Sequence, residues 1–177
     1  MSFPQAPQKY DPHWPAIYKA EATAITLACG DFIQRIEHIG STAIAGMIAK
    51  PIIDILISVK QNKLQSLIAP MQKLQFTSRG ENGIPSRAYF SKPAGENQLA
   101  VHVHCFEEGH EAIDKHIAFR NYLIGHPEVA DQYRKLKMEI LSKPNIDRDT
   151  YQNLKSDFLI QTTALAVEWM KTGKLGI

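Results

Sequence analysis

Hydrophobic side chains recur along the chain with two periods, one typical of helices and one typical of strands. Apolar residues at helical spacing over 14–28 predict a helix that starts at Asp11-Pro12 and stops at Gly30. The segments 32–39 and 51–59 read as strands, and the second is a nearly continuous run of Ile, Leu and Val that carries one carboxylate. The first third of the chain is therefore expected to place a helix before a pair of strands.

The pattern changes from β to helical in the second half of the chain. Helical spacing over 64–74 predicts a further helix, kinked or restarted at Pro70. Strand patterns follow between residues 76 and 106, and the remainder predicts helices near 110–124, 127–141 and 148–171. A helix followed by a central β region and a helical end is typical of the α+β class, and we expect a mixed sheet covered by helices.

Length and composition restrict the class of protein. The chain has 177 residues, 44% hydrophobic and 21% charged, which excludes a disordered chain, a coiled coil and a collagen-like repeat. The length favours one domain over 1–177, with residues 1–10 as a loose arm. Because 20 Lys and Arg face 18 Asp and Glu, the net charge of +2 does not predict a nucleic acid or a membrane surface as the partner. With neither a signal peptide nor a membrane-spanning stretch in the sequence, we expect a cytoplasmic protein.

The two cysteines, Cys29 and Cys105, form no C-x-x-C pair. This spacing argues against a disulfide scaffold and against a classical zinc finger. Two separate reduced thiols in the core are the simpler interpretation, and a single bridge between them is the alternative.

The segment that joins the two predicted strands carries the clearest candidate chemistry. Gly40 would let the backbone approach an anion, Ser41 could donate a hydroxyl hydrogen bond, and the N–H groups from Thr42 onward would start a helix that favours phosphate. Asp54, on the return strand, could hold a divalent cation beside that phosphate. A plain helix cap is the alternative, since Gly-Ser also serves that purpose.

Two histidines on a later strand could belong to the same site. His102 and His104 lie at i and i+2, so both imidazoles face one side of their strand. They could be two metal ligands, a metal ligand and a base, or donors to a phosphate. If they face the side of Asp54, a site with two histidines and a carboxylate becomes possible. The alternative is that both are sheet-face histidines bonded to neighbouring groups.

Several basic and aromatic side chains could complete an anion pocket. Arginine offers a planar fork for phosphate or carboxylate, whereas a structural ion pair is the alternative at each position. The mixed charges over 133–139 indicate a solvated helix face. The candidates are Lys50, Arg87, His116 and Arg120, together with Lys137, Tyr151 and Lys155 on the later helices.

Six motifs occur in order along the chain and together are highly specific: Tyr10–Pro15, Ile36–Ala43, Lys50–Ile55, Gly83–Pro85, His102–His104 and His116–Arg120. With these motifs the chain resembles the GrpB family, proteins with a nucleotidyltransferase-like fold, over nearly its whole length. The resemblance implies a mixed β-sheet flanked by helices, with a helical C-terminal part over 110–177.

The resemblance to the wider nucleotidyltransferase superfamily implies Gly-Ser, then Asp-x-Asp/Glu on the next strand, then a third acid on a later strand. Gly40-Ser41 and Asp54 are similar to that pattern, but Leu56 stands where the second acid is expected. His102 and His104 stand where the third acid would be. The site implied therefore holds a divalent metal (Mg, Mn or Zn) through Asp54, His102 and His104, which are also the catalytic candidates.

Two functions follow from these residues. The first is an enzyme that binds a nucleotide or other phosphorylated ligand with a divalent metal and transfers a nucleotidyl or phosphoryl group. The second is a nucleotide- or anion-binding module without transferase activity. Both predict the same phosphate contacts: Gly40, Ser41, Thr42, Lys50, Arg87, His116 and Arg120.

Overall fold

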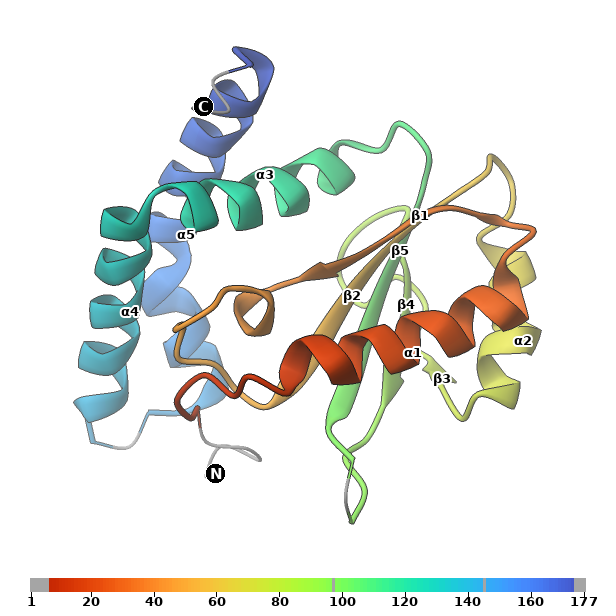
Figure 1. Ribbon diagram of the computed structural model, residues 1–177, viewed down its shortest axis with the longest axis horizontal. Helices are drawn as coiled ribbons and strands as arrows, with labels where there is room; N and C mark the ends of the chain where they lie inside the picture. Colours follow the sequence, from red (N-terminus) through yellow and green to blue (C-terminus); the bar gives the residue numbers. More distant parts are fainter. Residues whose placement is uncertain (1–6, 97, 145, 174–177) are drawn as a thin grey trace.

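Five strands form one mixed sheet at the centre of the computed structural model, which describes residues 7–96, 98–144 and 146–173 (Figure 1). The order in the sheet is β1-β2-β5-β4-β3; β2 and β5 run parallel, and the other neighbours are antiparallel. This arrangement confirms the α+β class and the mixed sheet. The strands are β1 (Ile33–Ile39), β2 (Ile52–Val59), β3 (Thr77–Ser78), β4 (Ala88–Lys92) and β5 (Ala100–Glu107).

The helices cover both faces of the sheet and make up the C-terminal part, as expected. Helices α1 and α2 precede β3, whereas α3, α4 and α5 follow β5 (Figure 1). Short 3₁₀ turns η1 and η2 lie before β2 and α2. The bounds are α1 (Trp14–Cys29), η1 (Ser41–Ala43), η2 (Gln65–Leu67), α2 (Ile68–Lys73), α3 (Glu111–Gly125), α4 (Pro127–Ser142) and α5 (Arg148–Lys171).

The main hydrophobic core lies between the sheet and helices α1 and α2. Alternate residues of β2, namely Ile53, Ile55 and Ile57, point into this core and are fully buried. They pack with alternate residues of β5 and with apolar residues of both helices, including Trp14 and Met71. Because successive side chains of a strand point to opposite faces, this core directs Asp54 and Leu56 to the other face.

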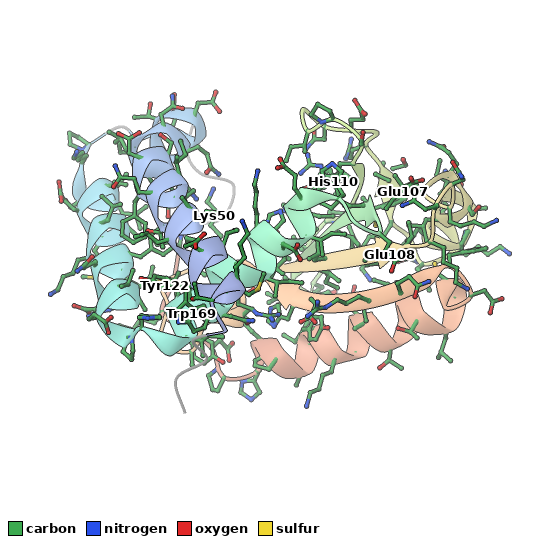
Figure 2. The ribbon with its side chains drawn as sticks, turned by 90° about the horizontal axis from the view of Figure 1, so that it is seen from above. Lys50, Glu107, Glu108, His110, Tyr122 and Trp169 are labelled. Carbon is green, nitrogen blue, oxygen red and sulfur yellow. The ribbon has the colours of Figure 1, made fainter. Side chains whose placement is uncertain are left out.

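The second face of the sheet is covered only in part. Helix α3 packs Ile113 and Ile117 against Leu56 and Phe106. Helices α4 and α5 stand together beside the sheet, and the ring centroid of Trp169 on α5 lies 5.7 Å from that of Tyr122 on α3 (Figures 1 and 2). The part of the second face that holds Asp54 is therefore not packed under a helix, and helices α4 and α5 lie beside it.

The Gly-Ser segment departs from the sequence-based prediction. Ser41 begins a single 3₁₀ turn of three residues, not an α-helix. So short a turn lacks the dipole of a full α-helix that was expected to attract a phosphate. Pro70 lies within the first turn of α2, where its missing N–H has no helical partner to lose, and the restart occurs just before it, from η2 into α2.

Other expectations have mixed outcomes. Cys29 and Cys105 are both free and buried, which confirms the simpler interpretation. Of the expected arm, residues 1–6 lie outside the described residues, and Gln8 pairs with Ala49 through two backbone hydrogen bonds. In the described part of the chain, no helix combines the length and apolarity needed to cross a bilayer. The single domain over 1–177 and the cytoplasmic location stay predictions.

Candidate functional site

A cavity of about 630 Å³ lies between the second face of the sheet and helices α4 and α5. The sheet supplies Asp54, Tyr89, His102 and His104, and the η1 turn supplies Ser41 and Thr42. The opposite wall comes from the two helices, and the loops before β2 and β4 complete the rim. The remaining lining residues are Ala49, Lys50, Ile52, Asn82, Arg87, Ala100, Lys137, Tyr151, Gln152 and Lys155.

Asp54 lies beside both histidines because β2 and β5 run parallel in register. Asp54 pairs with His102 and Leu56 with His104, so all three polar side chains share one face. Asp54 Oδ1 is 3.6 Å from His102 Nδ1 and 3.6 Å from His104 Nε2. Burial alone would raise the pKa of Asp54, but its interactions with the two imidazoles hold that pKa well below the ordinary value. Asp54 is therefore a carboxylate at neutral pH.

Arg87 fixes the roles of the two ring nitrogens of His104. Its Nη1 atom lies 3.1 Å from His104 Nδ1, and a guanidinium can only donate, so Nδ1 accepts and Nε2 carries the proton toward Asp54. The other nitrogens of Arg87 donate to the carbonyls of Glu81 (3.1 Å) and Asn82 (2.7 Å). Arg87 is thus a buried cation held by the loop before β4, and both nitrogens of His104 have partners.

Lys137 projects from α4 and is almost completely buried, with 2% of its surface exposed. Its Nζ atom lies 2.5 Å from Ser41 Oγ, donates to the Ile48 carbonyl at 2.9 Å and is 4.2 Å from the centroid of the Tyr133 ring. Burial, with the charge of Lys155, lowers the pKa of Lys137 to about 7, although Asp54 acts in the opposite direction.

Two further lysines gather around Tyr151. The Nζ atoms of Lys155 and Lys50 lie 4.9 Å and 5.7 Å from the centroid of its ring. Burial, with the charge of Lys50, lowers the pKa of Lys155 to about 8. Burial also raises the pKa of Tyr151 to about 12, so the ring stays a neutral phenol. This end of the cavity is rich in cations at neutral pH.

Thr42 and Gly40 position neighbouring groups of the site and offer no free hydroxyl or charge to a ligand. Thr42 Oγ1 donates to the Ile52 carbonyl at 3.1 Å and lies 3.0 Å from His38 Nε2, so its hydroxyl is already used. Burial lowers the pKa of His38 to about 4, which keeps this imidazole neutral. Gly40 packs directly against the Asp54 side chain. Of the Gly-Ser-Thr segment, Ser41 keeps a hydroxyl that faces the cavity together with Lys137.

Besides Gly40, the predicted phosphate contacts His116 and Arg120 lie outside the cavity lining. Arg120 Nη1 donates to Glu37 Oε2 and to the His38 carbonyl, both at 2.7 Å, which is the structural ion pair named as the alternative. His116 lies behind His104, with the ring centroids 5.6 Å apart, and burial lowers its pKa to about 4. Neither side chain is placed to contact a ligand in the cavity.

The expected metal ligands do not form a preformed cation site. Within residues 7–96, 98–144 and 146–173, no three His, Cys, Asp or Glu side chains are grouped so that they could hold a metal ion. His102 Nδ1 and His104 Nε2 both face Asp54 Oδ1, and His104 Nδ1 accepts from Arg87. Metal binding by these three residues stays a prediction.

The interpretation of 133–139 as a solvated helix face is wrong at two positions. Tyr133 and Lys137 are 3% and 2% exposed, and Ile140 is also buried. Residues 133, 137 and 140 follow the spacing of a buried helix face. Lys137, Tyr151 and Lys155, which the sequence offered as candidates for an anion pocket, all line the cavity. Asn82, Tyr89 and Gln152 line the cavity without having been candidates, and no sequence pattern marks them.

Comparison with known proteins identifies relatives over most of the chain. The family model described as GrpB protein matches residues 7–164. The protein YqkA of Bacillus subtilis is 37% identical over 92% of this chain and 47% of its own length, so the chain spans about half of YqkA. The glutamate-rich protein GrpB of Alkalihalophilus pseudofirmus is 31% identical over 83% of this chain and 87% of its own. The crystal structure of the conserved protein GrpB from Enterococcus faecalis superposes with a TM-score of 0.83 at 30% identity, covering 92% of this chain and 98% of that one.

Proposed function

This chain belongs to the GrpB family, and we propose that it binds a phosphorylated small molecule, a nucleotide among them, in the cavity between the sheet and helices α4 and α5. The observation that carries the proposal is the imbalance of charge in the cavity wall. Asp54 is the one carboxylate among the described lining residues, whereas four lining side chains are lysine or arginine: Lys50, Arg87, Lys137 and Lys155.

Burial makes this imbalance unfavourable without a ligand. The pKa values of Lys137 and Lys155 are lowered chiefly because burial disfavours their charged forms. An anion in the cavity would offset that penalty, since charge-assisted hydrogen bonds to phosphate oxygens are among the stronger ones in proteins. The free energy of binding would therefore include relief of an existing electrostatic strain.

The size and the aromatic lining favour a ligand larger than inorganic phosphate. A volume of about 630 Å³ lies within the range of roughly 300 to 1,000 Å³ typical of small-molecule pockets. Tyr89 and Tyr151 add aromatic surface to the otherwise polar wall. An organic group attached to a phosphate, as in a nucleotide, would use both kinds of surface.

A second candidate function is the transfer of a nucleotidyl or phosphoryl group with a divalent ion. The adjacency of Asp54, His102 and His104 favours it, and these are the residues that would hold the ion. One ring nitrogen of each histidine faces Asp54, and the other nitrogen of His104 accepts from Arg87. We therefore propose anion binding alone, and metal-dependent transfer stays a prediction.

Calorimetric titration of the protein with pyrophosphate, ATP and adenosine, in the presence of EDTA, tests the proposal. We expect heat of binding for pyrophosphate and ATP and none for adenosine, because the cations recognise the phosphate groups. Absence of binding by both phosphorylated ligands would contradict the proposal, whereas binding only after Mg²⁺, Mn²⁺ or Zn²⁺ replaces EDTA would favour the second candidate.

A further inference from the structure

Ser41 and Lys137 form a pair that phosphate binding alone does not require. We propose that Ser41 is a nucleophile, with Lys137 as its general base, and that it accepts a phosphoryl group from the ligand in the cavity. The identity of the donor as a bound phosphoanhydride rests on the proposed function; the reactivity of the pair does not.

The geometry is that of a nucleophile beside a base. Lys137 Nζ is in direct hydrogen-bond contact with Ser41 Oγ, the contact that a general base needs with its nucleophile. The Tyr133 ring lies beside Lys137, with its centroid 4.2 Å from Nζ. Ser41 lines the cavity, so the hydroxyl faces both its base and the space that a ligand would occupy.

The surroundings of Lys137 favour a neutral amine. Within the described residues Lys137 forms no ion pair with a carboxylate, and its second partner is the Ile48 carbonyl. The charged or titratable groups that face it are Lys155 from α5, Asp54 from β2 and Tyr133 from its own helix. Lys155 opposes the ammonium form and Asp54 favours it, and the resulting pKa of about 7 leaves a substantial neutral fraction at physiological pH. The neutral amine can donate to Ile48 and accept the proton of Ser41.

The transfer step conserves atoms and charge. Ser41 Oγ attacks the phosphorus of the terminal phosphoryl group, and its proton passes to Lys137 Nζ. The Oγ–P bond forms while the bond from phosphorus to the bridging oxygen breaks, and the electron pair leaves with the shortened phosphate. Lys50, Arg87 and Lys155 line the same cavity and would stabilise the charge on the phosphoryl and leaving oxygens.

An uncharged alkyl fluorophosphonate tests the pair independently of anion binding. Its reaction with Ser41 forms an Oγ–P bond, releases fluoride and sends the hydroxyl proton to Lys137. Intact-mass spectrometry would follow the rate, and peptide sequencing would locate the adduct. We expect one adduct, on Ser41, and a rate that rises through about pH 7 as Lys137 loses its proton.

Variants separate a base from a merely structural lysine. Removing a general base typically costs about 10²- to 10⁴-fold in rate, and we expect a loss in that range for Lys137→Gln. Lys135→Gln, on the same helix with a side chain 72% exposed, should label at the native rate. Ser41→Ala should form no adduct. Failure of native protein to label at Ser41, or equal rates for Lys137→Gln and native protein, would overturn the inference.

The native pH profile keeps the test valid if Lys137→Gln does not fold. A labelling rate independent of pH between about 6 and 8 would overturn the role of Lys137, because a base with a pKa near 7 must change its protonation in that interval. Labelling without any binding of pyrophosphate or ATP would contradict the proposed function and leave the nucleophile intact. Binding of pyrophosphate or ATP without labelling of Ser41 would support the proposed function and overturn the role of Ser41 as a nucleophile.

Discussion

Gly40 and Asp54 face each other where β1 meets β2, and they are so close that no side chain fits at position 40. A Cβ atom there would lie 2.7 Å from Asp54 Oδ2 and 3.1 Å from its Cβ. Gly40 also has φ 72° and ψ −172°, a conformation that is essentially restricted to glycine. The glycine therefore sets the position of the carboxylate within the cavity.

Gly40→Ala should destabilise the protein and displace Asp54. Backbone strain in this region costs of order 1–3 kcal/mol, and the clash with Asp54 adds to it. Gly46→Ala is a matched control, since Gly46 also has a positive φ but a Cβ added there would meet no atom within 4 Å. Urea unfolding should show a larger loss in the free energy of unfolding for Gly40→Ala than for Gly46→Ala. Equal losses would mean that the clash with Asp54 does not contribute to the destabilisation.

Asp54→Asn should strengthen anion binding if the cavity works without a metal. The substitution preserves the shape and removes the carboxylate from a wall that otherwise holds cations. Less repulsion of the ligand should tighten pyrophosphate binding, by about tenfold if the repulsion removed is near 1.4 kcal/mol. Calorimetry in EDTA measures this change. Weaker pyrophosphate binding by Asp54→Asn in EDTA would contradict this prediction.

Anion affinity should fall as the pH rises through about 8. The pKa of Lys155 is lowered to about 8, so its ammonium is present below that pH and is lost above it. Sulfate is a suitable probe because its own charge does not change over this range. Lys155→Arg should retain affinity at about pH 9, since a guanidinium stays protonated. A native affinity that is the same at about pH 7 and about pH 9 would contradict this assignment.

Arg120→Gln should reduce stability without changing anion affinity. The substitution removes one of the two arginines that pair with Glu37, because Arg35 remains 2.7 Å from Glu37 Oε1, and we expect the loss to cost about 1.5–3 kcal/mol. Arg134→Gln is the control, because the Arg134–Asp131 pair is much more exposed and is expected to contribute about 0–1 kcal/mol. Thermal unfolding and pyrophosphate titration of both variants test the prediction. A weaker affinity for Arg120→Gln at unchanged stability would place Arg120 in the site after all.

The sequence identified Asp54, His102 and His104 on the sheet face of the site, but not Tyr89. Strand alternation put Asp54 on one face of β2 and both histidines on one face of β5, and parallel pairing in register brought them together. Helix α5 also matches its predicted bounds of 148–171, because a capping Asp147 precedes a long helical segment.

The sequence offered Lys137, Tyr151 and Lys155 as pocket candidates, but the contact of the helical wall with the η1 turn could not be predicted. Ser41 and Lys137 are 96 positions apart, and only the packing of α4 beside η1 brings them into contact. A lysine among other charged residues of a helix reads as solvated, although Tyr133 and Ile140 share its buried face. Likewise, one turn of 3₁₀ helix cannot be distinguished from a helix start when only Gly-Ser-Thr is known.

Titration of Lys155→Gln and Lys135→Gln with pyrophosphate in EDTA tests most directly whether this cavity is an anion site. Both variants remove one lysine charge, but Lys155 lines the cavity and Lys135 pairs with Asp131 on the surface. We predict that Lys155→Gln loses at least about tenfold in affinity, the equivalent of one charge-assisted hydrogen bond of about 1.5 kcal/mol, whereas Lys135→Gln binds like the native protein. Equal affinities of the two variants would contradict the account.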